Sequence, residues 1–222
     1  ALDPDYKEAW NNLAAAYLAR RRVKEASGAV EKALAVDPNY VEPLLVGARI
    51  LDLEERKAEA LAAYEAYLAA AGDDAGVRLA LARLSRDLGR GEEAVAHLRM
   101  AVALAPGDPR PRRELAQTYW KAENLEAARR ETQVVVDLDE DDGEMRYILA
   151  RDLAQQREYK AAVKKYRKIL GMDPKNLEFR DQLWILTESQ RDLARIFEKI
   201  DQPTLALHHW SEYLRLVPED TE

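Results

Sequence analysis

The sequence of 222 residues contains no cysteine, which excludes disulfides, thiolate metal sites and a cysteine nucleophile. Aromatic residues make up only 7% of the chain, and β-branched residues are also few, so helices are favoured over a β-sheet core. Basic residues are outnumbered, with 34 Lys and Arg against 41 Asp and Glu, and this net charge of −7 argues against a nucleic-acid partner. No run approaches the ~20 apolar residues that a membrane helix needs, so we expect no direct insertion into a membrane.

The sequence also lacks an initiator Met and a charged-then-apolar leader. We therefore expect a piece of a longer array, with a cytoplasmic location as the default and a periplasmic or membrane-anchored parent as the alternative. Arginine outnumbers lysine about two to one and alanine is abundant, which is typical of a GC-rich bacterial genome.

What the sequence does contain is an internal repeat with a period of 34 residues. Pro4, Pro38, Pro106 and Pro174 are separated by this interval or by multiples of it. Two series of small residues follow the same interval, namely Ala14, Ala48, Ala82, Ala116, Ala150 and Ala26, Ala60, Ala94, Ala128, Ala162. Each period holds two stretches of helical spacing divided by a short polar turn, and the prolines mark helix ends. The pattern predicts one helix–turn–helix hairpin per period.

The phased residues of the first period are Trp10-x2-Leu13-Ala14-x2-Tyr17-x8-Ala26-x3-Val30-x2-Ala33-x4-Pro38. In this pattern the chain resembles the tetratricopeptide repeat (TPR) family of 34-residue helical hairpins. The fit is looser in the second and third periods, where Gly47, Tyr67, Arg78 and Ser85 replace the usual residues. The resemblance implies an all-α fold, a right-handed α-solenoid of about six stacked hairpins and twelve helices.

The period also predicts the boundaries of a single array over residues 1–222. We expect residues 1–6 to be the tail of a preceding repeat, and five repeats to follow at 7–40, 41–74, 75–108, 109–142 and 143–176. A sixth repeat, 187–220, arrives ten residues late. Because the extra residues 177–186 contain neither Pro nor Gly, we expect one long helix over 177–200.

No residue pattern predicts catalysis, a cofactor or a metal site. Adjacent residues of a helix point about 100° apart, so His208 and His209 cannot chelate one ion alone. The acidic run from Asp137 to Glu144 lacks the Gly and Glu spacing of a calcium loop and suits the start of a helix. We expect a non-enzyme without cofactors; the alternative is the regulatory array of a larger enzyme.

The resemblance implies that the first helix of each hairpin lines a concave groove in which ligands lie. The residues predicted to line it are mostly basic and aromatic: Arg49, Arg83, Arg86, Arg110, Arg113, Gln117, Trp120, Lys121, Tyr147, Arg151 and Arg195. Arginine–aromatic clusters are typical of interaction hot spots. We therefore predict a scaffold or adaptor that binds an acidic or extended segment of another protein. The alternative is that the arginines pair with Asp52, Asp87, Glu114 and Glu144 on a solvated face.

A second surface is also predicted on the apolar part of the long helix. Phe179, Leu183, Trp184 and Ile185 would form an exposed patch that docks another protein or supports self-association. The alternative is that these side chains pack back onto the fifth hairpin.

Overall fold

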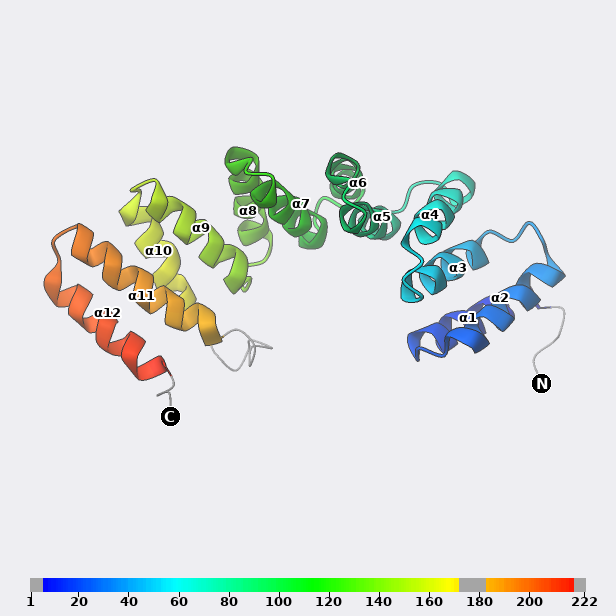
Figure 1. Cartoon of the computed structure of the whole chain (residues 1–222), viewed down its shortest axis with the longest axis horizontal. Coiled ribbons are helices and arrows are strands. Elements are labelled where there is room, and N and C mark those ends of the chain that lie inside the picture. Colours follow the sequence, from blue (N-terminus) through cyan, green and yellow to red (C-terminus); the bar gives the residue numbers. More distant parts are fainter. Residues whose placement is uncertain (1–5, 172–182, 218–222) are drawn as a thin grey trace. The chain divides into compact units, whose positions relative to one another are not determined.

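The computed structural model describes residues 6–171 and 183–217, and every regular element in these ranges is an α-helix (Figure 1). The all-α prediction and the predicted twelve helices are thus confirmed. In chain order they are α1 (Lys7–Ala19), α2 (Val23–Val36), α3 (Glu42–Leu53), α4 (Lys57–Ala71), α5 (Ala75–Asp87), α6 (Gly91–Leu104), α7 (Pro109–Lys121), α8 (Leu125–Leu138), α9 (Gly143–Gln155), α10 (Tyr159–Leu170), α11 (Leu183–Lys199) and α12 (Pro203–Leu216).

The helices form two compact units, residues 1–106 with α1 to α6 and residues 107–222 with α7 to α12. Within each unit the helices pair as three antiparallel hairpins, and the second helix of one hairpin packs against the first helix of the next. The fold is therefore an α-solenoid of stacked hairpins, as the sequence predicts. Whether the two units form one array stays a prediction.

The hairpin turns share one backbone geometry. In all six, one residue has a positive φ, namely Arg21, Glu55, Gly89, Glu123, Arg157 and Asp201. The next N–H donates to a carbonyl five residues earlier, as in Arg22 N–H to Tyr17 O at 2.9 Å. This bond closes the end of the first helix and reverses the chain within three residues. The 34-residue interval of the turns, 44 for the last, repeats the interval of the sequence pattern.

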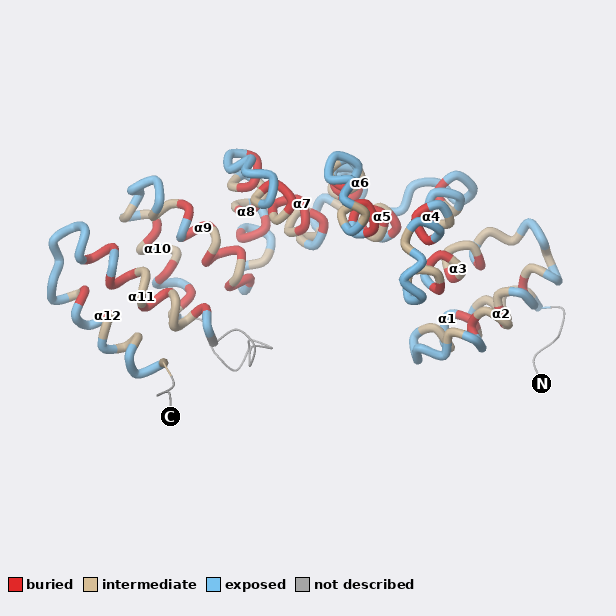
Figure 2. Tube along the Cα trace, viewed as in Figure 1, coloured by how far each residue is buried: buried red, intermediate tan, exposed pale blue. Residues whose placement is uncertain are grey.

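The small residues lie where the two helices of a hairpin meet. Both alanine series, from Ala14 to Ala150 and from Ala26 to Ala162, are at most 1% exposed. Figure 2 shows the buried residues following the facing sides of the helices. A residue without a long side chain lets two helix backbones approach to ~8–9 Å. Larger residues fill the space between hairpins; Leu81, for example, is fully buried against Tyr64 and Leu68 of α4.

The predicted helix over 177–200 is described from Leu183, and it ends at Lys199, one residue earlier than expected. Phe179 and residues 177–182 lie outside the described residues, as does the side chain of Leu183. Ile185 was predicted on an exposed patch, and this is wrong: it is 2% exposed and packs with Tyr147 and Tyr166. Trp184 is 46% exposed, so its role in docking or self-association stays a prediction.

His209 has a packing role in the last hairpin. Its ring stacks on Phe197 with centroids 5.3 Å apart and planes at 4°, and its Nδ1 lies 2.7 Å from Gln190 Oε1. Burial, the neighbouring His208 and Arg167 together lower the pKa of His209 below its usual 6.5. The folded chain thus holds this imidazole neutral over a range in which the unfolded chain protonates it.

We predict that His209 lowers the stability of the fold as the pH falls from about 7.5 to about 5, against the opposite contribution of Asp52 and Asp142, whose pKa values burial raises. His209→Gln therefore shifts the pH dependence toward greater relative stability at low pH. A folded-state pKa below 6.5 means that the unfolded state binds more protons in this window, so stability falls as pH falls until the folded pKa is reached. Urea unfolding at both pH values measures it. His97, whose pKa is also lowered by burial, makes a contribution of the same sign that the variant retains. Equal pH dependence in both proteins would contradict the prediction.

Candidate interaction surface

In the first unit, the predicted groove residues have neighbours of their own. Arg49 of α3 is exposed and hydrogen-bonds to Tyr64, whose pKa burial raises to about 12. Arg83 of α5 is exposed and lies near Asp52, where its charge opposes the rise in pKa that burial causes. Arg86 is half-buried and also interacts within the chain. Here the arrangement resembles the solvated, internally compensated face that the sequence left as the alternative.

In the second unit, two predicted arginines at the start of α7 have acidic partners. Arg110 binds the carboxylate of Asp108, which also caps α7 by accepting the Arg110 N–H at 2.9 Å. Arg113 pairs with Asp142 and, at 3.4 Å, with Glu144 at the start of α9. Asp142 is buried and accepts the Met145 N–H, so Arg113 connects α7 to the cap of α9. Burial raises the pKa of Asp142, and Arg113 opposes this shift.

The end of α7 contributes to a hollow that we call the apolar hollow. Its volume is about 280 Å³, and it is lined by Trp120, Leu125, Ile148, Arg151, Asp152 and Gln155. Trp120 is half-buried and donates its indole N–H to Thr132 at 3.3 Å, which fixes the ring at the edge of the hollow. Gln117, one turn earlier, is also half-buried, and Lys121 is exposed.

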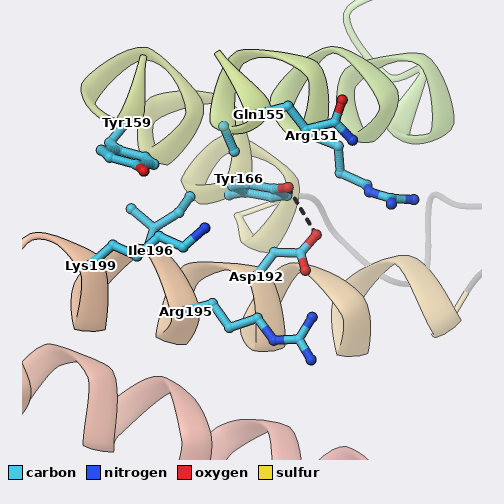
Figure 3. Close-up of a pocket in the computed structure, with 9 residues that line it drawn as sticks. Arg151, Gln155, Tyr159, Tyr166, Asp192, Arg195, Ile196 and Lys199 are labelled. Carbon is cyan, nitrogen blue, oxygen red and sulfur yellow. Dashed lines mark hydrogen bonds between the residues drawn. The ribbon is translucent and has the colours of Figure 1, made fainter. Parts of the chain in front are cut away.

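A second hollow, which we call the basic hollow, lies between α9, α10 and α11 (Figure 3). Its volume is about 200 Å³, and it is lined by Arg151, Ala154, Gln155, Tyr159, Tyr166, Asp192, Arg195, Ile196 and Lys199. Figure 3 shows Arg151 extending from α9 and Arg195 from α11, on either side of Asp192. Arg151, Arg195 and Lys199 are exposed, and they form no ion pair within the described ranges.

The one carboxylate in the basic hollow is held by other groups. Asp192 accepts hydrogen bonds from the hydroxyls of Tyr166 at 2.9 Å and Tyr147 at 3.3 Å, and Arg191 Nε lies 3.6 Å away. Burial, and then the charge of Asp192, raise the pKa of both tyrosines well above the usual 10. Both phenols are thus neutral donors that fix the carboxylate between the two arginines.

Tyr147 was predicted to face the groove, and this is wrong, since it is only 3% exposed. Its backbone position on α9 turns the ring toward α11, where its one hydroxyl proton lies within reach of the carboxylates of Asp192 at 3.3 Å and Glu188 at 3.4 Å. The guanidinium of Arg151 lies 5.8 Å from the centre of this ring, and the exposed Trp184 packs edge-on against it at 5.4 Å. Tyr147 therefore supports two surface residues instead of forming the surface.

The two hollows share Arg151 and Gln155 of α9, so they lie on either side of one helix ridge. The sequence did not single out Gln155, Lys199, Tyr159, Leu125 or Ile148. Gln155 and Lys199 each follow a predicted arginine by four residues in the same helix, and this spacing could have identified them. Tyr159, Leu125 and Ile148 enter the hollows through contacts between helices, for which the sequence carries no separate signal.

These observations define the chain as a helical repeat protein whose second unit carries a basic and an apolar hollow on one face. It belongs to the tetratricopeptide repeat family, which it matches over residues 7–40, 50–109 and 85–151. Members of this family are generally non-catalytic scaffolds for protein interaction, and the fold and family support a role as a protein-interaction scaffold for this chain. No curated protein sequence matches the chain.

Solved structures of low sequence identity share the fold. PilF of Pseudomonas aeruginosa has a TM-score of 0.68 at 21% identity, over 96% of this chain and 93% of its own. The C-terminal part of a TPR protein from Cytophaga hutchinsonii has a TM-score of 0.80 at 17% identity, over 98% and 86%. YrrB, described as a TPR protein with an unusual peptide-binding site, has a TM-score of 0.63 at 18% identity, over 82% and 90%.

Among the helices that the structure describes, none combines the length and the apolar character needed to cross a membrane. In residues 6–171 and 183–217, no group of three or more His, Asp or Glu side chains is arranged to hold a metal ion.

We predict that Tyr166→Phe lowers the free energy of unfolding by about 1–2 kcal/mol, because it removes a buried hydrogen bond to a carboxylate. Tyr159→Phe is the matched control, since this half-buried tyrosine lines the same hollow without a hydrogen bond to the described residues. Its effect should stay within about 0.5 kcal/mol. Denaturant titration measures both variants, and equal losses would contradict the role of the Tyr166 hydroxyl.

Proposed function

We propose that the chain is a non-catalytic scaffold that binds an acidic, extended segment of another protein across α9 of its second unit. The segment contacts the basic hollow with an acidic group and the apolar hollow with an apolar side chain. Arg113 and Arg110, which have acidic partners inside the chain, have no part in this contact.

The observation that carries the proposal is the set of cations around the basic hollow. Arg151, Arg195 and Lys199 line one space of about 200 Å³ and have no acidic partner in an ion pair among the described residues. Asp192 lies between the two arginines, but three cations surround this one carboxylate, so the hollow keeps an excess of positive charge. An incoming carboxylate offsets that excess while it accepts hydrogen bonds from the guanidinium groups. Arginine is well suited to such recognition because its planar fork donates in pairs.

The neighbouring hollow supplies the apolar half of the contact. Trp120, Leu125 and Ile148 form the apolar part of the lining of this open hollow, whose volume of about 280 Å³ is enough for one aliphatic side chain. Gln155 borders both hollows, and its amide can donate to and accept from a peptide backbone that crosses α9. Trp184, exposed and supported by Tyr147, extends the surface at the start of α11. An extended segment fits this arrangement because its alternate side chains point to opposite sides.

The proposal is tested by selecting peptides of about 12 residues from a random displayed library on the native chain, and then measuring their affinity for variants. We predict that the selected peptides are enriched in Asp and Glu, and that Arg151→Glu with Arg195→Glu weakens binding at least about tenfold, which is ~1.4 kcal/mol. The control is Arg130→Glu with Arg215→Glu, which makes the same change of net charge at exposed positions of α8 and α12.

The control double variant should bind within about threefold of the native chain, because its changes lie on second helices and act only through the overall field. Selected peptides without acidic enrichment, or equal loss in both double variants, would count against binding in the basic hollow. Circular dichroism of each variant verifies the helical fold before affinities are compared.

A further inference from the structure

A second charged surface lies on α10, apart from both hollows. In this helix of 12 residues, five side chains are basic and none is acidic, although the whole chain carries a net charge of −7. The five are Lys160, Lys164, Lys165, Arg167 and Lys168. The opposite side of α10 is apolar and buried, with Ala162, Tyr166 and Ile169 in the core. The basic side of α10 therefore faces solvent.

Three of these lysines form a row along the helix. Lys160, Lys164 and Lys168 are exposed and follow one another at intervals of four residues, so each lies ~6 Å further along the helix axis and ~40° further around it. Like charges at this interval destabilise a helix, and Lys160 at its first turn also opposes the helix dipole. The lysine row thus lowers the stability of α10. The packing of this helix in the core depends on its apolar side and not on the lysines.

The chain itself neutralises this row only at one end. Lys168 pairs with Glu140 at 2.6 Å, and the half-buried Lys165 next to the row donates to Gln133 at 3.2 Å. Lys160 and Lys164 form no ion pair with any residue that the structure describes. Burial lowers the pKa of Lys165, and the charges of Arg146, Lys164 and Lys168 lower it further while Asp137 opposes them. The positive charges are therefore close enough to repel one another.

We propose that the lysine row of α10 is a second interaction surface, which binds an extended acidic segment of another protein with Asp or Glu at every second residue. Alternate residues of an extended chain are ~6.6 Å apart and point the same way, which matches the ~6 Å step between the lysines. Two successive acidic side chains then lie opposite Lys160 and Lys164, while Lys168 is already paired with Glu140. This surface is separate from the one across α9, because the row lies on a second helix and lines neither hollow.

The lysine row has acidic residues on both sides, and this favours a narrow protein segment over a membrane or a nucleic acid as its partner. On the α8 side, Asp137 and Glu140 lie beside it, and on the α12 side Glu212 lies near His209 together with Arg167. A flat anionic bilayer would approach these carboxylates as well as the lysines. Single-stranded nucleic acid binds through exposed aromatic side chains, whereas Tyr166 of α10 is fully buried and Tyr159 lines the basic hollow. A single acidic segment needs only Lys160 and Lys164, which form no ion pair with the described residues.

The test uses three labelled peptides with blocked ends: five Ser-Glu pairs, five Ser-Gln pairs, and a peptide of the first composition with its five Glu contiguous. Fluorescence anisotropy with the whole chain measures their affinity at about 50 mM and about 200 mM salt. The alternating Glu peptide should bind at least about fivefold more tightly than the contiguous one, the Gln peptide should not bind, and binding should weaken with salt. Lys160→Glu with Lys164→Glu should weaken binding at least about tenfold.

The double variant Arg130→Glu with Arg215→Glu is the matched control, because it changes the net charge as much as the lysine variant does at other exposed positions. It should leave binding of the alternating peptide within about threefold. If Arg151→Glu with Arg195→Glu removes binding while the lysine variant does not, the peptide binds across α9 and the lysine row is not the site. If alternating and contiguous peptides bind alike, the spacing argument is wrong. Tighter binding to phosphatidylglycerol vesicles or to oligo-dT than to the peptide would overturn the assignment of a protein partner.

Folding of the lysine variant has its own readout. Because Lys160→Glu with Lys164→Glu removes like-charge repulsion and places an acidic side chain in the first turn of α10, its unfolding midpoint should be equal to or higher than that of the native chain. A variant that is more stable but no longer binds the peptide would indicate that the lysines serve contact with a partner and not the stability of the fold. A lowered midpoint would mean that the lysines support the fold, which contradicts the proposal.

Discussion

The close contact between alanines inside each hairpin is the constraint on which the rest of the structure depends. Ala82 and Ala94, like their equivalents in the other hairpins, are almost completely buried, so the two helices pack backbone to backbone over short distances. A hairpin packed in this way has one apolar side still uncovered, and it gains stability only when the next hairpin covers that side. Stacking within each unit, and the 34-residue period itself, follow from this requirement.

Stacking also decides where charged side chains are exposed to a binding partner. The sides of the helices that face neighbouring hairpins carry mostly apolar residues, so most charged residues lie on solvent-facing surfaces. First helices carry Arg151 and Arg195 on one such surface, and α10 carries Lys160 and Lys164 on another. Some carboxylates and phenols lie between hairpins. The hydroxyl of Tyr166 in α10, for example, donates to Asp192 in α11, and both residues line the basic hollow. The same contacts that stabilise the second unit thus shape its surface.

Several features of the site could be predicted from the sequence because they depend on position along one helix. Arg151 and Arg195 were placed on first helices by the period, and the structure gives both exposed positions. Their roles in binding stay predictions. Arg113 pairs with Glu144, which the sequence offered as a partner of the groove arginines, but its second partner Asp142 was not predicted, because it is 29 residues away and caps another helix. The prediction that Tyr147 is exposed was wrong for a similar reason. Its exposure depends on whether α11 covers it, and the ten extra residues before α11 interrupt the period from which that packing could have been predicted.

The sequence by itself determined the helical class, the number of hairpins and the alanines between them, since these depend on spacing within about 34 residues, and spacing is visible in a linear chain. Only the tertiary structure decided which charged groups have partners and which surround an open hollow. That distinction depends on side-chain contacts between residues such as Arg113 and Asp142 or Tyr166 and Asp192, which are distant in sequence and meet only after the hairpins stack. Exposure and pairing are properties of the stacked hairpins, so no single repeat encodes them.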